Sequence, residues 1–91
     1  MDIKQPDEKD AFNAAIAMVL KLRRTERNMT IGAVAAASGL KEQAVQSYLS
    51  GERPILVGNL MVLARALKLD PAQVMTAAEA RLAKSSDQSI L

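Results

Sequence analysis

The stretch from residue 30 to residue 51, TIGAVAAASGLKEQAVQSYLSG, constrains this chain most, because two short helical patterns meet there at a glycine. The first pattern predicts a helix over Ile31–Ser38 with Thr30 as its N-cap, since threonine accepts a hydrogen bond from first-turn amides. Gly39 follows, and glycine adopts the positive φ of a sharp helix end without a Cβ clash. We therefore expect a tight corner, with Leu40 pointing inward.

A second helix is predicted over residues 41–50, ending at Gly51. Its apolar side chains Val45, Tyr48 and Leu49 stand at i, i+3 and i+4, so they share one face that we expect to be buried. The opposite face is polar and carries Glu42, Gln43, Gln46 and Ser47.

Two longer patterns flank this pair of short helices. A segment over residues 7–27 begins with acidic side chains and ends with basic ones, the order that the helix dipole favours. Another amphipathic helix is predicted over residues 56–67. The expected core positions of both are Phe12, Ala15, Ile16, Val19, Leu20 or Leu22, Val57, Leu60, Met61, Leu63, Ala64 and Leu67, with Met29, Met75 and Tyr48 added to the core.

The last helix has a clear start signal. Asp70 is placed as N-cap, Pro71 at the first helical position and Gln73 as the partner of a capping box. A helix is therefore predicted from Pro71 to about Lys84.

The chain has 91 residues, which is the size of one domain. We predict a disordered N-terminus over residues 1–6, a single folded domain over 7–84 and a frayed tail over 85–91. The chain holds only one Phe and one Tyr, and its β-branched residues are too scattered for alternating strands. The predicted fold class is all-α.

Several classes of function are disfavoured by composition. The chain has no cysteine and no histidine, its carboxylates are scattered, and it has no glycine-rich phosphate loop. We therefore predict no enzyme activity, no catalytic residue, no metal, no cofactor and no small-molecule ligand. No apolar run approaches the roughly 20 residues of a membrane span, and the N-terminus lacks the order of a signal peptide. The expected location is the cytoplasm.

Basic residues are concentrated in the middle of the chain. Residues 21–53 carry six Lys or Arg against three Asp or Glu, whereas residues 1–20 carry two against four. This excess suits a polyanionic partner such as nucleic acid, and a solvated basic face is the alternative.

A set of residues inside and beyond the central stretch stands at the spacing of a known family. The set is Thr30, Val34, Ala35, Gly39, Leu40, Val45, Tyr48 and Gly51, followed by Leu60, Leu63, Ala64, Leu67 and Leu69. In these residues the chain resembles the helix-turn-helix of the Cro/C1/Xre family of phage and bacterial regulators, over about Val19 to Val74. The resemblance implies a five-helix, lambda repressor-like fold. It also implies a transcriptional regulator, a repressor or Cro-like protein, that binds specific sequences in double-stranded DNA.

The second helix of such a motif lies in the major groove, where side chains read base edges. Gln43 can pair with adenine, Glu42 can accept from cytosine N4, Ser47 can bond either way, and the Ala44 methyl can pack on a thymine methyl. The resemblance makes Glu42, Gln43, Ala44 and Ser47 the base readers, with Gln46 as a further candidate. A polar solvent-exposed face is the alternative.

Phosphate contacts are predicted for Thr30, Lys41, Ser50, Arg53, Arg23 and Arg24. For the two arginines near the end of the first helix, stabilisation of that helix end is the alternative reading. The chain departs from the family pattern at Leu49, where a glutamate usually pairs with an arginine of the first helix. It also departs at Ile31, where the family often has glutamine.

One helix-turn-helix covers few base pairs, so a homodimer on two half-sites is expected, at least on DNA. The hypothesised dimer surface is the last helix, through Val74, Met75, Ala78 and Leu82, with the long first helix as the competitor. The rival function is a protein-interaction module on the same fold, such as an antitoxin-like partner or an adaptor that binds another regulator.

Overall fold

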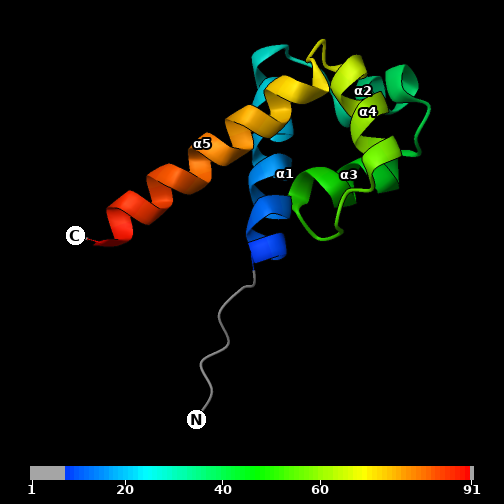
Figure 1. The fold of residues 1–91 in the computed structure, drawn as a ribbon. Coiled ribbons are helices and arrows are strands. Elements are labelled where there is room, and N and C mark those ends of the chain that lie inside the picture. The colour runs from blue at the N-terminus through cyan, green and yellow to red at the C-terminus, as the bar shows by residue number, and fades with distance from the viewer. Residues whose placement is uncertain (1–7, 91) are drawn as a thin grey trace.

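The computed structural model describes the backbone of residues 8–90 and the side chains of residues 8–84, and it contains five helices and no strand in that range (Figure 1). The helices are α1 (Glu8–Glu26), α2 (Ile31–Ser38), α3 (Glu42–Ser50), α4 (Val57–Ala66) and α5 (Pro71–Ile90). The predicted all-α class and the five-helix arrangement are confirmed. The predicted N-terminal segment, residues 1–6, lies outside the described residues.

The five helices enclose one core. α1 packs against α3 and α5, α2 packs against α3 and α4, and α4 also contacts α5. α5 crosses α1 near its own start and then runs away from the other helices (Figure 1). Each helix contributes at least one fully buried side chain to the core, and these are Leu20, Val34, Val45, Leu63, Ala64, Val74 and Ala78. Leu67, just after α4, is fully buried as well.

The corner between α2 and α3 forms as the sequence predicts. The Thr30 side chain accepts a hydrogen bond of 3.0 Å from the amide of Ala33, which caps the start of α2. Gly39 has a φ of +80° and donates its amide to the carbonyl of Ala35. Leu40 is partly buried against the core, so the chain turns sharply and α3 begins beside α2.

The start of α5 is also capped as predicted. The Asp70 carboxylate accepts from the amide of Ala72 at 2.9 Å, and the Gln73 side chain accepts from the amide of Asp70 at 3.2 Å. The helix continues to Ile90 rather than ending near Lys84. Residues 85–90 contain neither glycine nor proline, so no backbone signal interrupts the helical hydrogen bonds there.

Three residues assigned to the core from the sequence are exposed instead. Val57 is 76% exposed, Met61 43% and Met75 41%. Each methionine directly follows a buried residue, and successive residues are turned by about 100° around a helix. The side chains of Met61 and Met75 therefore point away from the core that Leu60 and Val74 enter.

Val57 is exposed because it occupies the first turn of α4, before the buried run of the helix begins at Leu60. On α1, the alternative between Leu20 and Leu22 is settled, since Leu20 is fully buried and Leu22 is exposed. Met29 is partly buried and packs against the core.

Two glycines allow a test of how backbone conformation contributes to stability. A Cβ added at Gly39 or at Gly58 would meet no atom within 4 Å, but only Gly39 has positive φ. We expect Gly39→Ala to lower the free energy of unfolding by about 1–2 kcal/mol. Gly58→Ala, inside α4, should raise it by about 0.4–1 kcal/mol. Urea denaturation of both variants measures the two values, and effects of the same sign would contradict the prediction.

Candidate nucleic-acid interface

The two faces of α3 differ sharply in exposure. On the inner face, Val45 is fully buried and Tyr48 and Leu49 are each only 4% exposed, as their spacing predicted. The outer face carries all five predicted base-reading residues, with Glu42, Gln43 and Gln46 exposed and Ala44 and Ser47 partly exposed. The structure therefore brings Glu42, Gln43, Gln46 and Ser47 together on one accessible surface, whereas Ala44 lies at its margin and packs partly against the core.

Three predicted phosphate ligands lie at the ends of α2 and α3. Thr30 is exposed, and its hydroxyl can still donate a hydrogen bond while it accepts one from Ala33. Lys41 is exposed and makes no capping bond to α3, although it holds the N-cap position. The Ser50 hydroxyl lies 3.1 Å from the carbonyl of Ser47, so it is already engaged at the end of α3.

Arg53 is held in the loop that follows α3. Its guanidinium lies over the ring of Tyr48, 4.9 Å from the ring centre. The Tyr48 hydroxyl accepts a hydrogen bond of 2.7 Å from the side-chain amide of Asn59 on α4. Sequence reasoning missed Asn59. The feature that could have indicated it is the tyrosine itself, because a buried tyrosine hydroxyl usually needs a polar side chain as a hydrogen-bond partner.

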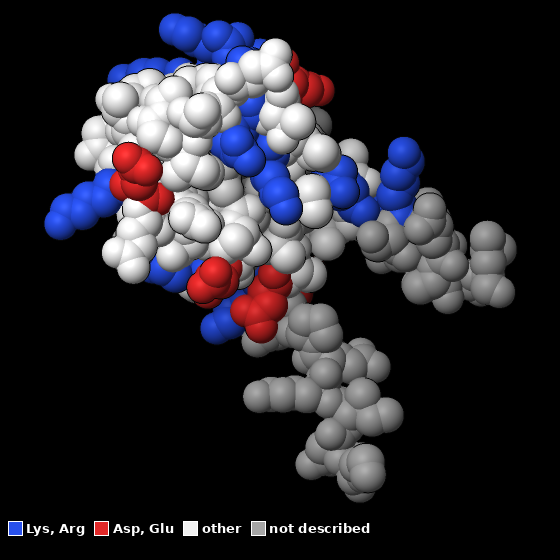
Figure 2. Space-filling model, turned by 180° about the vertical axis from the view of Figure 1, so that it is seen from behind, with Lys and Arg blue, Asp and Glu red and all other residues white. Residues whose placement is uncertain are grey.

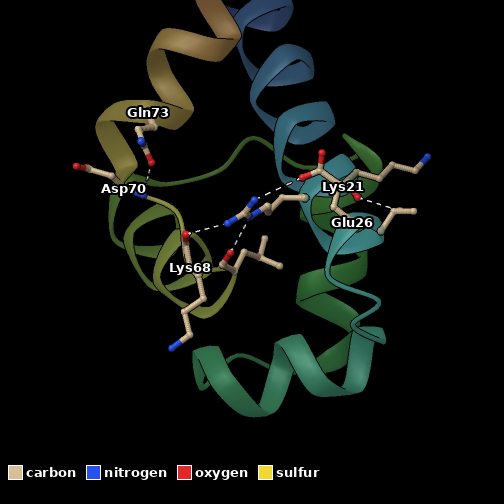
Figure 3. A network of polar contacts seen from close by, with 8 residues as sticks. Lys21, Glu26, Lys68, Asp70 and Gln73 are labelled. Carbon is tan, nitrogen blue, oxygen red and sulfur yellow. Dashed lines mark hydrogen bonds and ion pairs between the residues drawn. The ribbon is translucent and has the colours of Figure 1, made fainter.

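Arg23 is engaged within the protein rather than directed at a ligand. Figure 3 shows the surrounding network of polar contacts, in which its partners Glu26 and Lys68 are labelled. Its Nε donates to the carbonyl of Leu67 at 3.1 Å, and its Nη2 donates to the carbonyl of Lys68 at 3.3 Å. Its Nη1 lies 3.5 Å from the carboxylate of Glu26. All three guanidinium nitrogens are therefore used, two of them to bind carbonyls at the C-terminal end of α4, where a cation is favoured.

Arg24 faces a different side of α1, toward α3. It lines a hollow of about 170 Å³ together with Lys21, Ile31, Gln46, Leu49 and Ser50. Its Nη1 donates to the carbonyl of Met29 at 2.9 Å, while its Nε is buried and has no acceptor among the described residues. Leu49 stands where the family usually has glutamate, and a leucine offers that nitrogen no acceptor. Ile31, the other departure, is partly buried against the core.

The hypothesised dimer surface on α5 needs correction. Val74 and Ala78 are fully buried inside the protomer, and Leu82 is partly buried against the same core. They pack where α5 meets the other helices, so Val74 and Ala78 cannot contact a second chain. Only Met75 of the four is exposed.

The surface charge of the domain is mixed. On the face shown in Figure 2, Lys and Arg side chains are spread widely, and acidic side chains lie at the lower edge, at the left and at the upper right. The first turn of α1 carries Glu8 and Asp10. None of the described helices is both long enough and apolar enough to cross a membrane.

The arrangement of α2, the corner at Gly39 and α3 is that of a helix-turn-helix, and α3 is the helix that presents a polar face. The family model described as Helix-turn-helix (HTH_3) matches residues 20–74. The chain therefore belongs to the Cro/C1-type helix-turn-helix family, whose members are DNA-binding regulators.

A solved structure has the same fold. It is the clp gene regulator ClgR from C. glutamicum, with a TM-score of 0.72 and 19% sequence identity, and the match covers 85% of this chain and 95% of that one. No curated protein matches the sequence.

The role of Arg23 in joining α1 to α4 can be tested through stability. Arg23→Ala removes two hydrogen bonds to main-chain carbonyls, so we expect the free energy of unfolding to fall by about 1–3 kcal/mol. Arg27→Ala is the matched control, because Arg27 is an exposed arginine just beyond the same helix. Urea denaturation measures both, and equal losses in the two variants would contradict the assigned role.

Proposed function

We propose that this protein is a transcriptional regulator that binds specific sequences of double-stranded DNA and reads the major groove with α3. The observation that carries the proposal is the division of α3 into a buried inner face and an exposed outer face of hydrogen-bonding side chains. A major groove admits a helix of this kind, and amide side chains can make paired contacts with a base edge. Within this class we propose a repressor or Cro-like role of the phage or bacterial type.

Gln43 is the central base reader in this proposal. Its side-chain NH2 group can donate to adenine N7 while its side-chain carbonyl accepts from the adenine N6 amino group, and it is exposed near the start of α3, the part of a recognition helix that contacts base edges. Ser47 lies one turn further along the same face, and Ala44 offers its methyl group to a thymine methyl. Gln46 extends the readout on the side of the hollow beside Arg24.

The proposed phosphate contacts come from groups that keep a donor facing solvent. Lys41 and Thr30 stand at the starts of α3 and α2, and Arg53 stands in the loop after α3. Arg24 and Ser50 line one hollow at the other end of α3 and form a second, smaller group of candidates. Arg23 is left out, since its guanidinium nitrogens already bind within the protein.

Two substitutions separate base readout from general attraction to DNA. Gln43→Ala should reduce the preference at one base pair by about 1–3 kcal/mol and leave binding to random duplex nearly unchanged. Arg53→Ala should weaken all duplexes about equally and lower the slope of log K against log salt by about one. Selection of bound oligonucleotides supplies the target, and fluorescence anisotropy at several salt concentrations measures both effects.

Equal losses on selected and random duplex after Gln43→Ala would refute base readout by this residue. If the unmodified protein binds no duplex at any salt concentration, the protein-interaction module becomes the better account of the fold.

We also propose that the protein binds DNA as a homodimer, because a single helix-turn-helix covers few base pairs and two copies reach two half-sites. The proposed contact surface is the apolar patch of Leu56, Val57 and Met61, of which Leu56 and Val57 are 68% and 76% exposed. Apolar groups clustered on a surface mark an interaction site more often than isolated ones do. This patch begins at the end of the loop that follows α3.

Val57→Asp tests the proposed dimer surface. Aspartate at the first position of a helix is favourable, so the variant should fold. We expect it to sediment as a monomer at concentrations where the unmodified protein is a dimer. Met75→Asp on α5 is the matched control and should remain dimeric. A dimeric Val57→Asp variant would rule out the patch, and a monomeric unmodified protein would rule out dimerisation away from DNA.

A further inference from the structure

The guanidinium of Arg24 has one edge that binds no acceptor among the described residues. Its Nη1 donates to the carbonyl of Met29, whereas its Nε is buried without a partner and its Nη2 forms no hydrogen bond in the described part of the chain. In Arg23, the same two nitrogens bind the carbonyls of Leu67 and Lys68. A buried donor without an acceptor is costly, so a group that supplies one is bound favourably.

The hollow of about 170 Å³ that Arg24 lines has a positive character. Lys21 lines it as well, and the described lining includes no acidic side chain. Neither Lys21 nor Arg24 forms an ion pair with another described residue. An anion that enters the hollow therefore meets two cations and no competing carboxylate.

The rest of the lining and the volume indicate what kind of anion fits. Ile31 and Leu49 offer apolar surface, and Gln46 and Ser50 offer polar groups. The volume is that of five or six water molecules at about 30 Å³ each. It lies below the roughly 300–1,000 Å³ of pockets for drug-sized ligands. A small anion with a short apolar chain matches both the lining and the size.

A carboxylate suits the free edge of Arg24. Its two oxygens can accept side by side from two nitrogens of one guanidinium, and this paired contact is among the stronger hydrogen-bonded arrangements in proteins. Arg24 is only partly buried, so its guanidinium has room to turn slightly and bring the covered Nε to a ligand.

We propose that this hollow is a binding site for a small carboxylate with a short apolar chain. The carboxylate accepts from Nε and Nη2 of Arg24 beside the charge of Lys21, and the chain lies against Ile31 and Leu49. The sequence alone predicted no small-molecule ligand. The site was not evident there because α1, α2 and α3 each supply part of the lining, and these parts meet only in the folded chain.

A bound carboxylate also acts on the proposed DNA interface, and this step rests on the function proposed above. Gln46 and Ser50 line the hollow and are proposed to contact DNA, as is Arg24. The ligand neutralises the charge of Arg24 and covers part of this surface, so duplex affinity falls when the hollow is occupied. DNA binding then responds to the concentration of a small carboxylate.

Butanoate is the probe for the site, and NMR titration at constant ionic strength measures its binding without DNA. We expect butanoate to shift the amide signals of Ile31 and Leu49, and inorganic phosphate to bind more weakly. Gln46→Glu places a carboxylate at the hollow and should weaken butanoate binding about fivefold, the factor for one like-charge pair about 4 Å apart in water. Gln43→Glu is the matched control, because Gln43 is equally exposed on α3 but does not line the hollow.

Arg24→Gln removes the proposed carboxylate partner and should weaken butanoate binding about tenfold or more. Arg27→Gln, which changes an exposed arginine outside the hollow, should bind butanoate as the unmodified protein does. Equal butanoate affinities of Gln46→Glu and Gln43→Glu would overturn the proposal. Phosphate binding as tight as butanoate binding, or no shift in the unmodified protein, would overturn it as well.

Fluorescence anisotropy with labelled duplex tests the effect on DNA binding. Saturating butanoate should weaken duplex binding by the unmodified protein more than by Arg24→Gln. Unchanged duplex affinity would refute the effect on DNA binding, while the NMR titration decides the site itself. A protein that binds butanoate but no duplex would support the site and refute the proposed function.

Discussion

The burial of Val45, Tyr48 and Leu49 holds α3 in the orientation on which the rest of the interface depends. These side chains anchor a helix of nine residues, which is too short to be stable in water by itself. Packing against α1 and α2 therefore supplies the stability that the helix lacks alone. Because the inner face of α3 is fixed against the core, the polar residues on the opposite face of the helix point outward together.

The basic end of α1 shows how one kind of residue serves two different purposes. Arg23 and Arg24 are neighbours in the sequence, and successive residues on a helix point in directions about 100° apart. Arg23 therefore reaches the carbonyl groups that end α4, whereas Arg24 reaches the hollow beside α3. One arginine stabilises the packing of the domain, and the other remains beside the proposed interface.

The chain has a formal net charge of only +2, so its attraction to DNA depends on where the individual charges lie. A protein with few basic residues attracts all DNA weakly, so it needs close contacts at defined positions to bind well. The ends of α2 and α3 gather several of its polar groups within a small area.

Local signals in the sequence predicted most of the secondary structure. The caps at Thr30 and at Asp70 with Gln73, and the glycine corner at Gly39, act over three or four residues, so the residues that form them are neighbours in the sequence. The inner face of α3 was predicted for the same reason, because its three residues recur at helical spacing. The exposure of Met61 and Met75 was not predicted, since a methionine beside a buried residue suits a core and a surface equally well.

The sequence by itself therefore determined the helices, their capped ends and the polar face of α3. Only the tertiary structure decided that Arg23 binds the end of α4, that Val74 and Ala78 face α1 and the core rather than a second chain, and that Arg24 lines the hollow beside α3. The physical reason is the range of the interactions. Capping and helical spacing connect residues within one or two turns, whereas these contacts depend on which distant segment packs opposite each side chain.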